Sequence, residues 1–161
     1  REAYNLFCSS GILFNHESPK RGFEFVTRKI TFAVAKIKFD LQKKLVLGNI
    51  KSKRDWGHAK DYVEAIWLML QQKKADDFVI STGVQHSVED FAKLAFSHVD
   101  LDYKKFIEVD EKLFRPTETE ALVGNSSYAK KVLGWKPKIK FNQLVKDMLD
   151  ADIEIVKKMK N

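Results

Sequence analysis

The segment from Gly11 to Lys29, with the sequence GILFNHESPKRGFEFVTRK, constrains the fold of this chain more than any other. Its first residues end an apolar run that begins near Asn5, and such a run is typical of a buried strand, as in parallel sheets. A polar turn over 15–22 follows, and then a helix that carries Arg28. Ligands of α/β sheets bind beyond the carboxyl ends of the strands. The amide, imidazole and two cations of this turn therefore suit a phosphate or a sugar hydroxyl.

Helical and extended patterns alternate along the rest of the sequence, which indicates an α/β fold. The few strands are short and two lie far apart, so we expect them to belong to a larger sheet. Ser87 with Asp90 is typical of a helix start, and Gly134 of a helix end. The expected strands cover 5–14, 45–47, 78–81 and 106–109, and the expected helices cover 24–39, 59–72, 88–99, 127–133 and the residues from 141.

Apolar spacing predicts which helix faces are buried. In the helix over 24–39, Arg28 and Lys29 fall outside the apolar stripe, and a solvated basic face is the simplest interpretation. Their closeness to the polar turn also makes both candidates for ligand binding. For the helix over 59–72, the predicted buried stripe consists of Ala59, Tyr62, Val63, Ile66, Trp67 and Leu70.

Composition restricts the classes of function. The 161 residues are 44% hydrophobic and 32% charged, which is typical of one globular domain. No apolar run reaches the roughly 18–20 residues that span a bilayer. Cys8, the single cysteine, cannot form an intrachain disulfide, so we expect a cytoplasmic protein. The net charge of +7 favours a phosphate-bearing small molecule over nucleic acid, because the aromatic residues follow core spacings. No Cys/His spacing predicts a metal site.

Three loop clusters carry groups suited to an anionic ligand. Two arginines from separate loops match phosphate oxygens, and a carboxylate can accept hydrogen bonds from a ribose diol. Each cluster also has an explanation without a ligand: a surface ion pair between neighbours, a histidine that caps a helix, or a solvated arginine. The sequence offers no nucleophile paired with a base. The clusters are Asn15/His16/Arg21, Arg54/Asp55/His58 and Arg115/Glu118.

Several long segments resemble the GDP-mannose 4,6-dehydratase family of extended short-chain dehydrogenases/reductases. They are spread over nearly the whole chain and are far more specific than a lone glycine motif. The segments are GILFNHESPKRG at 11–22, FVTRKI at 25–30, KRDWGHAKDYVEA at 53–65, FRPTE at 114–118 and LGWKP at 133–137.

The resemblance implies a fold, a reaction and residue roles. The family converts GDP-mannose to GDP-4-keto-6-deoxymannose, a lyase reaction of GDP-fucose and deoxyhexose biosynthesis, with a tightly held NADP. The implied NADP contacts are His16 and Arg21. The implied substrate contacts are Asn15, then Val26 and Lys29 on the guanosine side, and Arg54, Arg115 and Glu118 on the GDP part.

The same resemblance implies that residues 1–161 are the C-terminal portion of such an enzyme: the last strands of the Rossmann sheet plus the smaller substrate-binding domain. The glycine-rich loop and the Tyr-x-x-x-Lys pair belong to the N-terminal half of the family. Tyr4 does not replace that tyrosine, since Cys8 stands four residues later. We therefore expect no catalytic residue in this chain, no activity from it alone, a marginal or aggregation-prone fold, and homo-oligomers of the full enzyme.

Two alternatives remain open. One is a nucleotide-sugar binding module without catalysis. The other is a related NAD-dependent epimerase or dehydratase that acts on a UDP- or dTDP-sugar.

Overall fold

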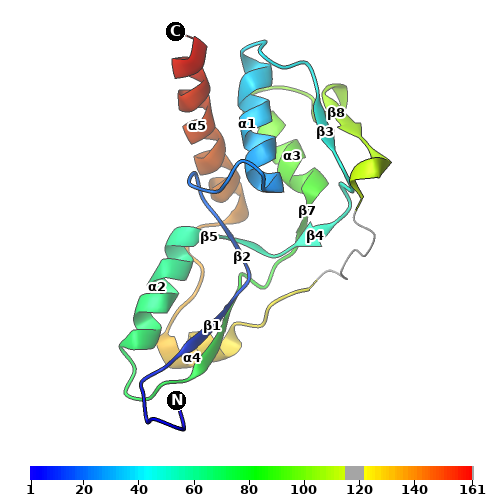
Figure 1. Ribbon diagram of the computed structural model, residues 1–161. Helices are drawn as coiled ribbons and strands as arrows, with labels where there is room; N and C mark the ends of the chain where they lie inside the picture. Colours follow the sequence, from blue (N-terminus) through cyan, green and yellow to red (C-terminus); the bar gives the residue numbers. More distant parts are fainter. Residues whose placement is uncertain (115–121, 161) are drawn as a thin grey trace.

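Helices and short strands alternate along the chain in the structure, a computed structural model that describes residues 1–114 and 122–160 (Figure 1). In chain order the elements are β1 (Ser10–Leu13), β2 (Asn15–Glu17), α1 (Val26–Lys38), β3 (Leu45–Leu47), β4 (Lys53–Arg54), β5 (Trp56–His58), α2 (Ala59–Leu70), β6 (Asp77–Ile80), β7 (His86–Ser87), α3 (Val88–Ser97), the 3-10 turn η1 (Tyr103–Lys105), β8 (Ile107–Val109), the 3-10 turn η2 (Glu111–Leu113), α4 (Ser127–Leu133) and α5 (Phe141–Lys160).

The strands form four separate two-stranded ladders among the described residues. Three of them are parallel: β1 with β6, β2 with β5, and β3 with β8. The fourth, β4 with β7, is antiparallel. Every ladder joins strands that are distant in sequence, with helices between them. The predicted α/β class is therefore confirmed.

Two groups of buried apolar side chains hold the elements together. The first lies among α1, α3, α5 and β3, in the upper half of Figure 1. The second lies between the β1–β6 ladder and the helices α2 and α4, at the bottom of that view. The β2 and β5 strands connect the two regions. No helix in the described part of the chain is long and apolar enough to cross a membrane.

The helix ends follow the chemistry of their sequences. Ser87 and Asp90 form a complete capping box at the start of α3, in which each side chain accepts from the backbone N–H of the other residue. Gly134 ends α4 in the left-handed conformation, with φ of 65°. The predicted helix positions are confirmed within a few residues.

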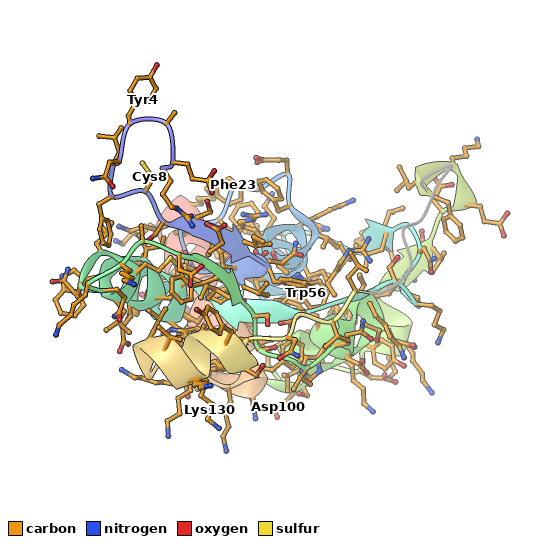
Figure 2. The ribbon with its side chains drawn as sticks, turned by 90° about the horizontal axis from the view of Figure 1, so that it is seen from below. Tyr4, Cys8, Phe23, Trp56, Asp100 and Lys130 are labelled. Carbon is orange, nitrogen blue, oxygen red and sulfur yellow. The ribbon has the colours of Figure 1, made fainter. Side chains whose placement is uncertain are left out.

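The buried strand predicted over 5–14 is wrong in two respects. Only Ser10–Leu13 is a strand, and Ile12 within it is 57% exposed. Tyr4 and Cys8 lie on a loop that stands away from the body of the molecule (Figure 2). In the described structure β6 is the only strand that pairs with β1, so the apolar run lacks the cover that would bury it.

The buried stripe predicted for α2 is also largely wrong. Its packed face consists of Asp61, Tyr62, Ala65 and Met69. Asp61 is fixed on that face because its Oδ2 accepts the backbone N–H groups of 138 and 139, each at 2.9 Å. The exposed apolar residues of the predicted stripe are Val63, Ile66, Trp67 and Leu70.

Candidate functional site

Strand pairing brings two of the predicted clusters together. β2 runs parallel to β5, with Asn15 opposite Trp56 and His16 opposite Gly57. Successive side chains of a strand point to opposite sides. Asn15 and Glu17 therefore share one side of β2, and His16 takes the other.

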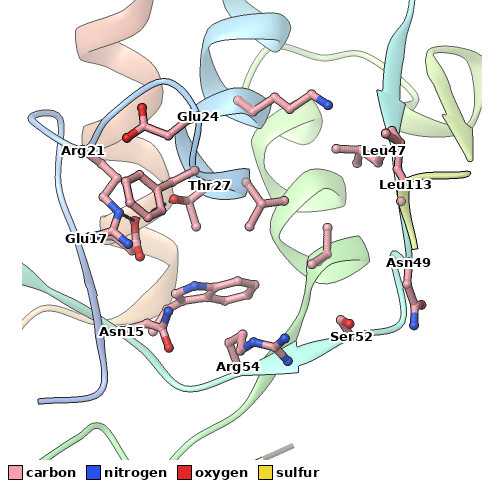
Figure 3. A pocket seen from close by; sticks show the side chains of 16 residues that line it. Asn15, Glu17, Arg21, Glu24, Thr27, Leu47, Asn49, Ser52, Arg54 and Leu113 are labelled. Atoms are coloured by element: carbon pink, nitrogen blue, oxygen red, sulfur yellow. Dashed lines mark hydrogen bonds and ion pairs between the residues drawn. The ribbon is translucent and has the colours of Figure 1, made fainter. Parts of the chain in front are cut away.

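The Asn15 side of β2 borders a pocket of about 680 Å³. Its walls come from β2, the turn after it, the first turn of α1, the loop after β3, and the β4–β5 segment (Figure 3). Residues as far apart in sequence as Asn15 and Leu113 thus face one space. The predicted site residues that line it are Asn15, Arg21, Val26, Lys29 and Arg54.

Sequence reasoning missed several residues of this pocket. Glu17 lies two positions after Asn15, and strand periodicity would have placed both on one side. Trp56 enters because it pairs with Asn15. Asn49 and Ser52 come from the loop between β3 and β4, which carries no motif that would mark it as part of a site.

Arg21 is held against one wall of the pocket. Its Cζ lies 3.5 Å from the centre of the Phe25 ring, a cation–π contact, and its Nε lies 3.3 Å from Glu17 Oε2. Glu17 is buried, and Thr27 Oγ1 donates to its Oε2 at 2.6 Å. Burial raises the pKa of Glu17, although the Thr27 hydrogen bond and the Arg21 charge oppose that rise.

His16 points away from the residues that line the pocket. Its Nδ1 lies 2.9 Å from the carbonyl oxygen of Phe14, and its ring stacks on Tyr62 with 5.1 Å between centroids. Since a carbonyl only accepts, Nδ1 donates this hydrogen bond. His16 therefore has Nε2 left for a polar group of a ligand on that side of β2.

The second predicted cluster separates into one pocket residue and two structural residues. Arg54 lines the pocket, and its Nη1 donates to the carbonyl oxygen of Lys53 at 2.6 Å. The alternative of an Arg54–Asp55 ion pair is wrong: Asp55 is buried and accepts the N–H groups of Thr82 and Gly83, each at 2.9 Å.

His58 takes the structural role that the sequence left open. Its Nδ1 accepts the Lys60 N–H at 3.1 Å and caps α2. Burial lowers the pKa of His58 and so favours the neutral ring that this cap requires, although the carboxylate of Asp147 opposes that shift.

The solvated basic face predicted for α1 is wrong at Arg28. This side chain is buried and pairs with Asp152 of α5. Lys29, the next residue, is exposed and lines the pocket. The step of 100° per residue along a helix places the two neighbours in different surroundings.

The third predicted cluster, Arg115 with Glu118, lies outside the described residues. Leu113, two positions before Arg115, belongs to the pocket wall. Within 1–114 and 122–160, no three His, Cys, Asp or Glu side chains are grouped to hold a metal ion. The described pocket offers three cations against two carboxylates, together with two amides and aromatic surface. This combination suits an anionic, partly planar ligand.

Sequence comparison identifies relatives over almost the whole chain. A family model described as GDP-mannose 4,6 dehydratase matches residues 1–148. GDP-mannose 4,6 dehydratase 1 of Arabidopsis thaliana is 56% identical over 160 residues, which is 99% of this chain and 44% of that protein. The human GDP-mannose 4,6 dehydratase is 48% identical over 174 residues, 98% of this chain and 47% of that protein. The chain thus spans a little under half the length of these relatives.

Solved structures share the fold. RMD from Pseudomonas aeruginosa, complexed with NADPH, superimposes with a TM-score of 0.82 at 22% identity, over 90% of this chain and 48% of that one. The dTDP-glucose 4,6-dehydratase of Bacillus anthracis, in complex with NAD, gives a TM-score of 0.76 at 17% identity, over 91% of this chain and 45% of that one. The predicted fold, part of an extended short-chain dehydrogenase/reductase, is confirmed.

Proposed function

Because this chain belongs to the GDP-mannose 4,6 dehydratase family, we propose that it supplies the substrate-binding part of an enzyme that converts GDP-mannose to GDP-4-keto-6-deoxymannose. The reaction is that of a lyase in GDP-fucose and deoxyhexose biosynthesis. The observation that carries the proposal is the pocket of about 680 Å³, which gathers five of the residues that the family resemblance marks.

The residues of the pocket divide the binding of GDP-mannose among them. Val26 and Lys29, on the first turn of α1, take the guanosine side. Arg54 binds diphosphate oxygens, because a guanidinium donates two parallel N–H groups to such an anion. Asn15 donates to and accepts from sugar hydroxyls. Arg115 and Glu118 complete the grip on GDP, as the family resemblance implies.

The cofactor of this proposal is NADP, which, when bound, takes up a hydride from the sugar and returns it. His16 and Arg21 are its proposed contacts. One observation fits the assignment of His16: its Nδ1 bonds to the carbonyl oxygen of Phe14, which leaves Nε2 for a ligand on the side of β2 away from Asn15. Arg21 contacts Phe25 and Glu17 on the pocket wall, and from there its charge would act on both ligands.

The proposal assigns binding but no catalytic residue to the 161 residues. We expect no turnover of GDP-mannose with NADP by this chain alone, and we propose that the full enzyme is a cytoplasmic homo-oligomer. Turnover by purified chain would contradict the first expectation.

Calorimetric titration with GDP, GDP-mannose and UDP tests the binding proposal. We expect binding of both GDP ligands in preference to UDP. Arg54→Ala should weaken GDP binding about 10–100-fold, since it removes hydrogen bonds to a charged group worth roughly 1.5–3 kcal/mol. Lys53→Ala is the matched control: it removes the same charge one residue away, outside the pocket wall. Preference for UDP, or equal effects of the two substitutions, would refute the proposal.

A further inference from the structure

A buried ion pair joins α1 to the C-terminal helix. Arg28 is 4% exposed and Asp152 is fully buried. Arg28 Nε donates to Asp152 Oδ1 at 2.7 Å and to Oδ2 at 2.9 Å, and Nη2 lies 2.7 Å from Oδ1. Thr31 Oγ1 adds a donation to Oδ2 at 2.6 Å. The carboxylate is thus fully engaged with α1.

The other edge of the same guanidinium reaches the turn before α1. Arg28 Nη1 donates to the carbonyl oxygen of Arg21 at 2.8 Å and also to that of Pro19. The turn also has internal bonds to Ser18, from Arg21 N–H to the carbonyl oxygen at 2.9 Å and from Lys20 N–H to Oγ at 3.1 Å. One side chain therefore holds two successive points of the segment that carries Arg21.

We infer that Arg28 is a positioning residue for the ligand pocket. By binding both carbonyls it fixes the backbone at Arg21, whose guanidinium then rests between Phe25 and Glu17. Asp152 holds Arg28 in the orientation that aims Nη1 at the turn. α5 thus acts on the pocket without lining it. This inference rests on the proposed function, since it concerns the same pocket.

The competing explanation is that the pair only fastens α1 to α5. The two explanations differ when both charges are removed together. A well-packed apolar pair often replaces a buried ion pair without loss of stability, whereas removal of one partner leaves a buried charge. The double variant Arg28→Met/Asp152→Leu therefore keeps the helices packed but takes away the donor to the turn. In this variant Thr31 Oγ1 can still donate to the backbone carbonyl oxygens of residues 27 and 28.

Three measurements on the 161-residue chain test the inference: urea unfolding, hydrogen exchange at the Arg21 amide, and titration with GDP. In the double variant we expect an unfolding midpoint close to that of the unsubstituted chain, faster exchange at Arg21, and GDP binding at least about tenfold weaker. The matched control is Lys146→Met/Asp150→Leu, which removes an exposed ion pair from α5 and should change none of the three.

Each adverse result has a separate meaning. A folded double variant that binds GDP within about twofold of the unsubstituted chain, or that leaves Arg21 exchange unchanged, overturns the inference. Absence of GDP binding by the unsubstituted chain overturns the proposed function instead. If the double variant fails to fold, Arg28→Lys takes its place, because lysine keeps the charge beside Asp152 but lacks the fork that spans both partners. The same loss of GDP affinity is then expected.

Discussion

Glu17 shows how one side chain can set the charge balance of the pocket. It is a buried carboxylate among three pocket cations, tied to Thr27 by a hydrogen bond of 2.6 Å and to Arg21 by a contact of 3.3 Å. Burial disfavours its ionised form, so its pKa is raised. The positive charge available to an anionic ligand therefore depends on the ionisation of Glu17.

The raised pKa of Glu17 predicts a pH dependence of stability. Between the ordinary value of 4.5 and the raised one, the folded state binds more protons than the unfolded state. The stability that protonated Glu17 gives to the folded state is fully present below pH 4.5 and is lost as pH rises through the folded-state pKa. Glu17→Gln keeps a neutral acceptor for Thr27 and lacks this loss. We therefore expect the difference in free energy of unfolding, Glu17→Gln minus the unsubstituted chain, to increase as pH rises.

Urea unfolding over a series of pH values from about 4 to 7 measures that difference. Asp152, whose pKa burial also raises, is present in both proteins and cancels in the comparison. Glu24→Gln, at an exposed position of the same pocket, serves as the control and should leave the pH profile unchanged. If the difference in free energy of unfolding between Glu17→Gln and the unsubstituted chain were constant over the whole pH range, the pH dependence could not be assigned to Glu17.

At the scale of elements, the helices and half of the strands could be predicted, and the other strands could not. α3 has both an apolar period and a capping box, so its position follows from local chemistry. β2, β4, β5 and β7 have only two or three residues each, which is too short for an alternation to be recognised. They exist because distant segments pair, as Asn15 does with Trp56. The residue clusters of the pocket could therefore be recognised in the sequence, but the strand pairing that brings them together could not.

The prediction of the buried face of α2 was wrong for a related reason. Periodicity identifies an apolar stripe but does not say which element covers it. α2 has apolar residues over more than one face, and the buried carboxylate of Asp61 decides which face packs. A charged residue thus fixed the rotation of a helix that its apolar residues left undetermined.

Gly134 provides a test of an element boundary. Its φ of 65° is one that L-residues with a Cβ rarely adopt, and an added Cβ would have no heavy atom within 4 Å. Any cost of Gly134→Ala is therefore due to the backbone alone. We expect a loss of about 1 kcal/mol in the free energy of unfolding, measured with urea. Gly134→Asn should cost less, since asparagine tolerates this conformation; equal stability of glycine and alanine would refute the argument.

At the scale of the whole molecule, the two cores differ in how well they are covered. The first has helices α1, α3 and α5 around it. The second is covered by α2 and α4, but the outer face of α2 is apolar: Val63 is 64% and Trp67 60% exposed, with Ile66 and Leu70 beside them. Contiguous exposed apolar surface of this kind marks an interaction site or an aggregation liability. The outer face of α2 is thus the surface from which we expect this chain to aggregate.

Substitutions on that face test the location. Ile66→Lys/Trp67→Lys should lower self-association and the binding of a hydrophobic dye, measured by light scattering and fluorescence. The free energy of unfolding should change by no more than about 0.5 kcal/mol, because exposed side chains contribute little to the core. Met159→Lys, at an exposed apolar residue of α5, is the control and should leave association unchanged. A loss of more than about 2 kcal/mol would mean that these side chains pack within the folded chain. Unchanged association would mean that another surface, such as the exposed residues before β1, drives it.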